Sequence, residues 1–199
     1  MFIRFLAVLC LVAAVSLSTS PAVAASYTFT TTLSGANEDP PNASPATGFA
    51  RIVLDTIANT LEIHAVFAGL VTPTTVAHIH APTAFPFSGN VGVAVQPPTL
   101  AGFPAGVTKG TYLWTFDTSD PSTYANSFLT NSGGGDALGA EAALMNSLFG
   151  GRAYLNIHTQ GYPAGEIRGF FVPIPLPAGL PLLLAAVGML VLVRRRRQA

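Results

Sequence analysis

The residues of this 199-residue chain best suited to bind a soft metal ion are its four histidines, His64, His78, His80 and His158. His78 and His80 are separated by one residue, so both imidazoles point to the same face if the segment is a β-strand. His158 shares its expected strand face with Tyr154 and Asn156. If the two strands approach each other, three imidazoles converge, and imidazole suits copper, zinc, iron and nickel, with copper or zinc favoured by affinity. The alternative is that these histidines only hydrogen-bond neighbouring loops.

Other polar residues give weaker signals. Glu166 and Arg168 lie two positions apart on an expected strand, which predicts a structural ion pair or a loop clasp rather than catalysis. Glu38 and Asp39 precede two prolines without EF-hand spacing, so a turn is predicted rather than a calcium site. His64 is predicted to be solvated or hydrogen-bonded. We predict no catalytic residues, because the chain has no nucleophile elbow, P-loop or dinucleotide fingerprint.

Alternating apolar and polar residues, separated by Gly, Pro, Asn and Asp, predict the elements that would position the histidines. The expected strands cover residues 27–34, 48–54, 60–68, 75–80, 90–95, 108–116, 152–159 and 165–171. Eight short strands with turn signals predict an all-β antiparallel sandwich or barrel. Trp114 is expected in its core. Apolar residues at helical spacing predict one short helix over residues 136–149, in a long connection that ends at Gly150.

The N-terminal residues 1–25 have the order of a secretory signal peptide, with Arg4, an uncharged run and a small-residue site. This order predicts cleavage at Ala24 or Ala25. The only cysteine, Cys10, lies inside this segment, so the outer domain, residues 26–171, is predicted to have no disulfide and no thiolate chemistry. That domain has four basic and nine acidic residues, a net charge of −5, which argues against nucleic acid as a partner.

The C-terminal residues form a tripartite tail: a proline-rich motif at 172–178, an uncharged apolar run at 179–193 and an arginine-rich end at 194–199. Arginines after an apolar run predict a separate transmembrane helix with the domain outside and the arginines in the cytoplasm. About 15 helical residues rise about 22 Å, less than a hydrocarbon core of about 30 Å. The span is therefore short, which favours a processing signal over an ordinary single-span anchor.

The proline-rich motif resembles the PEP-CTERM class of sorting tails, in its VPLPA-like variant. The motif residues that carry the resemblance are Val172, Pro173, Pro175, Leu176, Pro177 and Ala178. The resemblance implies an exosortase-type membrane protease as a partner. It also implies that the chain is tethered to the inner membrane through its C-terminal helix before processing and then reaches the cell surface or the extracellular space.

Four ordered segments of the outer domain resemble the CHRD domain, which is named from the chordin proteins. They read LSGANEDPP at 33–41, AHIH at 77–80, NIHT at 156–159 and PAGEIRG at 163–169. One departure is Ala81, where that family usually has glycine after the histidine pair. The resemblance covers nearly the whole domain.

A weaker resemblance links residues 61–80 and 151–158 to copper/zinc superoxide dismutases. It implies an eight-stranded Greek-key barrel in which His78, His80 and His158 stand for three of the copper ligands. The chain has no histidine between His80 and His158 to bridge two metals, no zinc-binding cluster and no disulfide. These departures put a zinc ion and dismutase activity in doubt.

Two hypotheses follow from the sequence. The leading one is a non-enzymatic surface or extracellular-matrix module that binds a protein or polysaccharide partner, without a required cofactor. The alternative is a copper-binding or redox protein that uses the three histidines.

Overall fold

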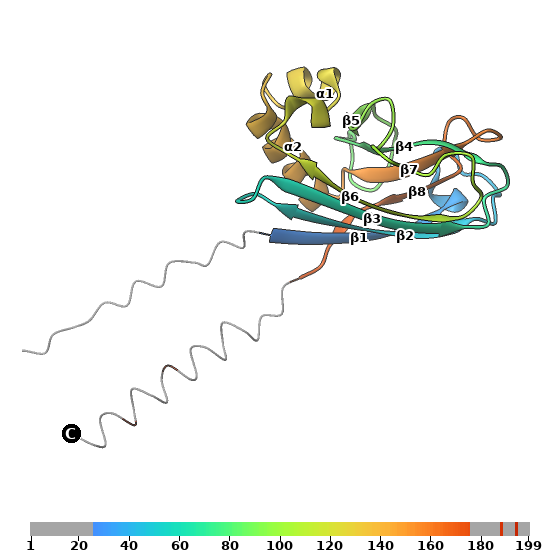
Figure 1. Cartoon of the computed structure of the whole chain (residues 1–199), viewed down its shortest axis with the longest axis horizontal. Coiled ribbons are helices and arrows are strands. Elements are labelled where there is room, and N and C mark those ends of the chain that lie inside the picture. Colours follow the sequence, from blue (N-terminus) through green and yellow to red (C-terminus); the bar gives the residue numbers. More distant parts are fainter. Residues whose placement is uncertain (1–25, 176–187, 189–193, 195–199) are drawn as a thin grey trace, which may run out of the picture.

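The computed structural model of the chain describes residues 26–175, together with residues 188 and 194. These residues form a mostly β domain, in which one antiparallel sheet is curled into a half-barrel and the α-helices gather at one end (Figure 1). The sheet order is β5-β4-β7-β8-β1-β2-β3-β6, and a further short strand, β9, pairs with β1. The neighbours β4 and β7, β8 and β1, and β3 and β6 are distant in sequence, so the sheet depends on long-range pairing.

Each strand expected from the sequence has an observed counterpart. The strands are β1 (Ser26–Ser34), β2 (Thr47–Asp55), β3 (Thr60–Ala68), β4 (Thr74–His80), β5 (Val93–Val95), β6 (Gly110–Asp117), β7 (Tyr154–Thr159), β8 (Ile167–Phe170) and β9 (Val172–Pro173). The helices are α1 (Asn126–Asn131) and α2 (Ala137–Phe149), with 3-10 helices η1 (Gly35–Asn37) and η2 (Pro121–Thr123). Strand β5 is shorter than expected because residues 90–92 run as a loop beside β4 instead of pairing in the sheet.

The core lies on the inner, concave side of the sheet. Strands β1, β2 and β3 form a meander that is paired over nine residues at each step. Alternate residues of each strand point inward, because side chains in a strand change face at every position. Fully buried examples from five strands are Phe29, Ile52, Ile63, Ile79 and Ile157. The other face of β4, β7 and β8 carries polar and aromatic side chains beneath loops, and the candidate site lies there.

Helix α2 confirms the helix expected from the sequence. The Asp136 side chain caps it by accepting a hydrogen bond of 2.7 Å from the Gly139 amide, an interaction that usually contributes about 1 kcal/mol. The last helical residue, Phe149, packs its ring edge-on against Tyr27 and Phe29 of β1. Helix α1 and the two 3-10 helices were not predicted, because short segments like these show little periodicity.

The predicted antiparallel β architecture is confirmed, whereas a closed barrel is not observed among residues 26–175. Strands β5 and β6 are the two ends of the sheet order and do not pair with each other. The superoxide dismutase-like Greek-key barrel therefore stays an expectation.

Trp114 corrects the prediction that it lies in the core. Its β3 partner is the fully buried Ile63, so the tryptophan is on the inner side of the sheet. Its side chain is nevertheless 45% exposed. Strand β6 ends the sheet, so within the described part of the chain no further strand covers that side of the indole.

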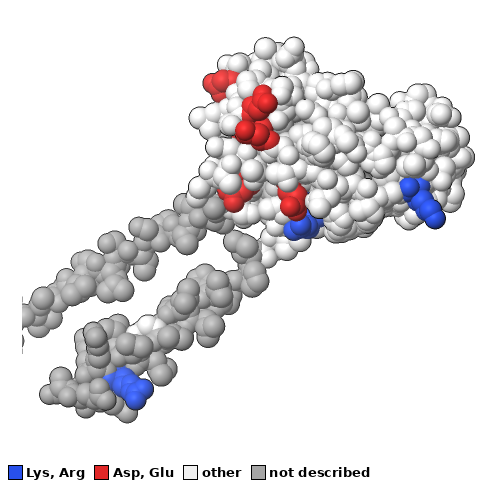
Figure 2. Space-filling model, in the orientation of Figure 1, with Lys and Arg blue, Asp and Glu red and all other residues white. Residues whose placement is uncertain are grey.

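Charged side chains are sparse on the face of the domain drawn in Figure 2. The acidic groups visible there gather over the end that carries the helices, and most of the remaining surface is uncharged (Figure 2). The acidic excess counted from the sequence is therefore unevenly distributed on this face.

The predicted terminal segments lie mostly outside the described residues. This applies to residues 1–25 with the cleavage positions Ala24 and Ala25, to the motif residues Leu176, Pro177 and Ala178, and to nearly all of the apolar run. The start of the motif is described: Val172 and Pro173 form β9 and pair with Thr30 and Phe29 of β1. Among the described residues, no helix has both the length and the apolar character needed to cross a membrane.

Candidate metal centre

Strand β4 carries two of the predicted ligands, His78 and His80, on the side of the sheet that faces away from the core. Ala77 and Ile79 alternate with them and are fully buried in the core. Loops cover the outer side, so the two histidines are only 8% and 9% exposed. The alternation predicted for this segment is therefore confirmed.

Strand β7 brings the third histidine to the same place. It pairs antiparallel with β4, with His78 opposite Asn156, so that His158 lies diagonally across from His78. The ring centres are 5.3 Å apart for His78 and His158, 5.6 Å for His78 and His80, and 6.2 Å for His80 and His158. The three imidazoles thus meet, as the metal hypothesis requires. His64 lies on β3 in the other half of the sheet and is not part of this cluster.

Each imidazole is oriented by a backbone carbonyl from a different loop. The pairs are His78 Nε2 with the Pro98 carbonyl at 2.7 Å, His80 Nδ1 with the Val91 carbonyl at 2.8 Å, and His158 Nδ1 with the Pro163 carbonyl at 3.0 Å. A carbonyl oxygen only accepts, so each of these ring nitrogens carries the proton and donates. In the neutral rings the lone pairs are therefore on Nδ1 of His78 and on Nε2 of His80 and His158.

Those three lone-pair nitrogens are buried, and none has a hydrogen-bond partner among the described residues. A buried acceptor without a partner costs about 1–3 kcal/mol. Three such atoms in one cluster need a donor, a shared proton or a metal ion. The loops that hold the rings contribute backbone carbonyls, which bond the other nitrogen of each ring and only accept hydrogen bonds.

The electrostatics of the site disfavour a shared proton near neutral pH. Burial lowers the pKa of His80 from 6.5 to about 4, and the charges of the other two histidines add to this lowering. Burial is also the main cause that lowers the pKa of His78 and of His158, partly offset by their backbone hydrogen bonds. At pH 7 the three rings are therefore neutral, which is the form that binds metals.

The spacing of the three nitrogens suits a metal ion after a small adjustment. One ligand atom from each histidine lies within 4.8 Å of the other two. In a tetrahedral site with bonds near 2.1 Å, nitrogen ligands lie about 3.4 Å apart. A modest inward rotation of the rings would reach that distance. Three protein ligands would leave one coordination position for water or an exogenous ligand.

Tyr154 limits the movement of His80. The two rings stack almost in parallel, with centres 4.8 Å apart and an interplanar angle of 4°. The Arg168 guanidinium also lies over the Tyr154 ring, with its carbon 4.9 Å from the ring centre. The Val91 amide donates to the Tyr154 hydroxyl at 3.4 Å, while the Val91 carbonyl holds His80. One loop residue thus fixes both stacked rings.

The buried carboxyl group of Glu38 lies next to Asn156 and Arg168. Glu38 reaches in from the loop after η1, where Asn156 donates to it at 3.4 Å and the Arg168 Nε lies 3.9 Å from its Oε2. Burial raises the pKa of Glu38 from 4.5 to about 7, although Arg168 and Asn156 both act to lower it. The sequence indicated only a turn at Glu38, because no local pattern shows that this turn folds over β7.

Glu166 and Arg168 form a loop clasp and not an ion pair with each other. The fully buried Glu166 accepts hydrogen bonds from the Ser44 hydroxyl, the Val71 amide and the Thr159 hydroxyl, at 2.7, 2.7 and 2.6 Å. Arg168 instead donates to the Asn90 side chain and to the carbonyls of Asn37 and Gly89. Both side chains fasten the connection between β1 and β2, and each holds one further loop, at Val71 for Glu166 and at residues 89–90 for Arg168.

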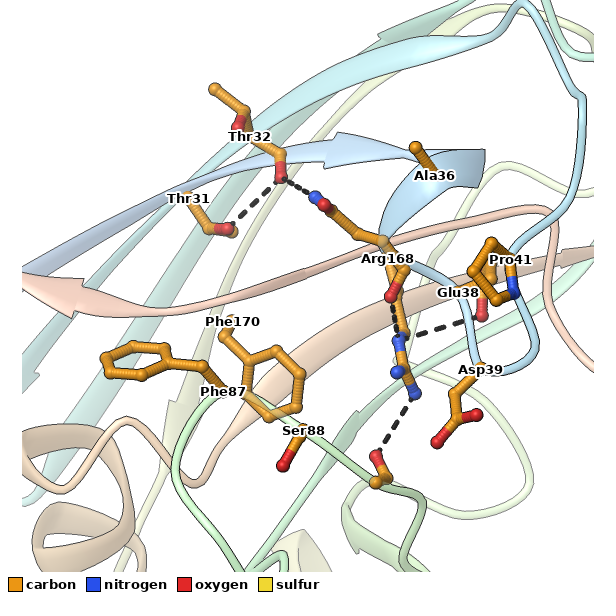
Figure 3. A pocket seen from close by; sticks show the side chains of 12 residues that line it. Thr31, Thr32, Ala36, Glu38, Asp39, Pro41, Phe87, Ser88, Arg168 and Phe170 are labelled. Atoms are coloured by element: carbon orange, nitrogen blue, oxygen red, sulfur yellow. Dashed lines mark hydrogen bonds and ion pairs between the residues drawn. The ribbon is translucent and has the colours of Figure 1, made fainter.

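A pocket of about 550 Å³ opens beside Arg168 (Figure 3). Its lining combines the charged groups of Glu38, Asp39 and Arg168 with the aromatic rings of Phe87 and Phe170. The Phe87 backbone has a φ of 57°, which is rare for an aromatic residue. Its ring is 58% exposed and meets Phe170 edge-on, with centres 6.2 Å apart. The pocket therefore presents an aromatic surface beside polar groups.

Comparison with known proteins gives one informative match. The family model for the CHRD domain matches residues 29–171, which is more than half of the chain and includes all three clustered histidines. No curated protein and no solved structure matches the chain. The matched segment coincides with the sheet from β1 to β8, so the chain belongs to the CHRD domain family.

Proposed function

We propose that this CHRD domain binds a transition metal ion, with copper preferred, through His78, His80 and His158. The observation that carries the proposal is the convergence of three histidines, each of which has one buried ring nitrogen without a partner among the described residues. Each ring is fixed by a hydrogen bond from its other nitrogen to a carbonyl, which is how proteins usually orient metal-binding histidines. The geometry supports metal binding better than the alternative, in which the three histidines only hydrogen-bond neighbouring loops.

The choice of copper rests on the ligand set. The cluster contains imidazole nitrogens only, and the affinity order for such ligands places copper above zinc and the earlier divalent metals. When bound, the ion would supply redox or Lewis-acid chemistry at its open position. Dismutase activity is not part of the proposal, because the sequence has no histidine between His80 and His158.

Elemental analysis of the purified protein tests the proposal. The chain should carry about one copper ion per molecule after equilibration with copper and removal of unbound ions. The His78→Ala/His80→Ala variant should retain none above background. His64→Ala is the matched control and should bind as much as the wild type, since His64 lies outside the cluster. Equal copper content in all three proteins would refute the site.

A second candidate function is the binding of a surface polysaccharide or protein partner at the pocket lined by Phe87 and Arg168. The exposed Phe87 ring offers a stacking surface, and Asp39 offers hydrogen-bond acceptors beside it. Co-sedimentation with polysaccharide extracted from the producing cells tests this role. Phe87→Ala should lower the bound fraction, whereas Phe85→Ala should not, because Phe85 is exposed but does not line the pocket.

Export and sorting complete the proposed role. The order of residues 1–25 and the motif at 172–178 support secretion, a temporary tether in the inner membrane and delivery to the cell surface or beyond by an exosortase-type protease. The domain would then work outside the cytoplasm, as a non-enzymatic metal-binding or partner-binding module.

A further inference from the structure

Strand β6 is an open edge of the sheet. It pairs with β3 along one side, from Gly110 to Asp117, and has no strand on its other side among residues 26–175. Natural proteins usually protect such edges with charges, prolines or bulges. Residues 110–116 contain no charge and no proline, and their pairing with β3 is regular. The edge is therefore competent to pair with another strand.

Two large apolar side chains are exposed at the centre of β6. Leu113 is 61% exposed on the outer face, and Trp114 is 45% exposed on the inner face. The register with β3 places Leu113 opposite His64 and Trp114 opposite Ile63. Within the sheet, both side chains have a neighbouring strand on one side only, although the loop at Gly102 also contacts the Trp114 ring. An added strand would give each a second neighbouring strand.

We infer that β6 pairs antiparallel with β6 of a second copy of this chain, around a two-fold axis at Leu113. In this register Lys109 of each copy faces Asp117 of the other. Both residues are exposed, so two ion pairs of opposite charge close the two ends of the shared ladder.

The same register matches the remaining side chains. On the outer face Leu113 meets Leu113, and Thr111 meets Thr115. On the inner face Trp114 meets Tyr112, an aromatic pair of the kind that stabilises antiparallel strands. Gly110 then lies opposite Phe116 and leaves room for its ring. A shift of two residues would place Asp117 opposite Thr111 or Val107 and lose both ion pairs, so the charges select one register.

The partner is a second copy because the edge is self-complementary. Antiparallel pairing of a strand with itself obeys two-fold symmetry, which is the commonest symmetry of protein dimers. Because the contact is isologous, the same Lys109–Asp117 ion pair forms once at each end of the shared ladder. The dimer would extend the sheet across both domains and leave the histidine site on β4 and β7 unaltered.

Disulfide trapping in cells tests the dimer with the full chain. The outer domain has no cysteine, so a Cys10→Ala background gives no native thiol. Residues directly opposite across antiparallel strands have Cα atoms about 4.5–5.5 Å apart, which a disulfide can bridge. With diamide as oxidant, Leu113→Cys should give a strong dimer band on a non-reducing gel.

Four variants fix the register and the background. Thr111→Cys and Thr115→Cys alone should give little dimer, since each faces the other residue, whereas the double variant should cross-link. Leu138→Cys is the control for random collision, because Leu138 is 74% exposed on α2. A Leu113→Cys band no stronger than the Leu138→Cys band overturns the dimer. Stronger cross-linking of Thr115→Cys than of Leu113→Cys overturns the register.

Exchange of the charges at Lys109 and Asp117, in the Leu113→Cys background, tests the dimer independently. Lys109→Asp or Asp117→Lys alone places like charges at both ends of the ladder and should weaken dimerisation roughly tenfold. The combined exchange restores opposite charges and should restore the dimer band. Failure of the double exchange to recover the band, with both chains folded by circular dichroism, contradicts the proposed pairing.

Discussion

His78 and His158 lie on neighbouring antiparallel strands with ring centres 5.3 Å apart, yet each ring donates to a proline carbonyl and neither donates to the other. The two carbonyls, of Pro98 and Pro163, belong to different loops that cover the outer side of the sheet. The hydrogen bonds turn the lone pairs of both rings toward the same buried space. This relationship underlies the proposed metal site.

The metal-free protein should lose stability below neutral pH because of His80. Burial lowers its pKa from 6.5 to about 4, so the unfolded chain takes up the proton first as the pH falls. The free energy of unfolding should then drop between about pH 6.5 and pH 4, by up to about 3 kcal/mol from this group. Urea denaturation of His80→Gln should show a shallower drop than the wild type. An identical drop in both proteins would contradict the buried, neutral state.

Glu38 should affect stability with the opposite pH dependence to His80, and Glu38→Gln tests this. The pKa of Glu38 is raised from 4.5 to about 7, so its contribution to stability is full below about pH 4.5 and is lost as the pH rises through 7. Glutamine mimics the neutral carboxyl, so the variant should be more stable than the wild type at pH 8 by about 1–3 kcal/mol. The gap should close toward pH 5. Lower stability of the variant at pH 8 would mean that the Arg168 pair outweighs burial.

The clasp made by Glu166 should dominate the stability of the loops around β8. Glu166→Ala leaves the Ser44, Val71 and Thr159 donors without their acceptor. We expect a loss of about 3–5 kcal/mol in the free energy of unfolding, measured with urea. Glu62→Ala is the matched control: its ion pair with Arg51 is exposed and should contribute under about 1 kcal/mol. Similar losses for both variants would refute the clasp.

The tail prediction concerns residues outside the described structure. Mass spectrometry of the surface-exposed protein should recover peptides from β1 to β9 and none from residues 182–193, if a protease removes the tail. Peptides from that segment in the mature protein would support an ordinary membrane anchor instead. If the motif carries the recognition, substitution of Pro175 and Pro177 should retain the tail.

The fold could be predicted from local patterns in large part. Alternation identified all eight main strands, and Asp136 with Gly150 marked the ends of α2. Trp114 was placed wrongly because a sequence does not show which strand ends the sheet. An inward-facing residue on an edge strand has the same pattern as one in the middle.

The candidate site could be predicted only in part. Two-residue spacing showed that His78 and His80 share a face, but the nearness of His158 depends on the pairing of β4 with β7. The Pro98 carbonyl and the buried Glu38 gave no signal, because backbone acceptors and loop positions are set by the tertiary structure. The sequence therefore indicates which side chains can bind a metal, but not which backbone groups orient them.

Copper titration of the full chain tests the central claim most directly. Wild type and the His64→Ala control should bind one equivalent of copper with equal affinity, measured against a chelator of known affinity. His78→Ala, His80→Ala and His158→Ala should each weaken binding by at least about tenfold, since each removes one ligand of three. Binding of equal strength in the wild type and in the His158→Ala variant would contradict the account, because it would place the copper away from the cluster.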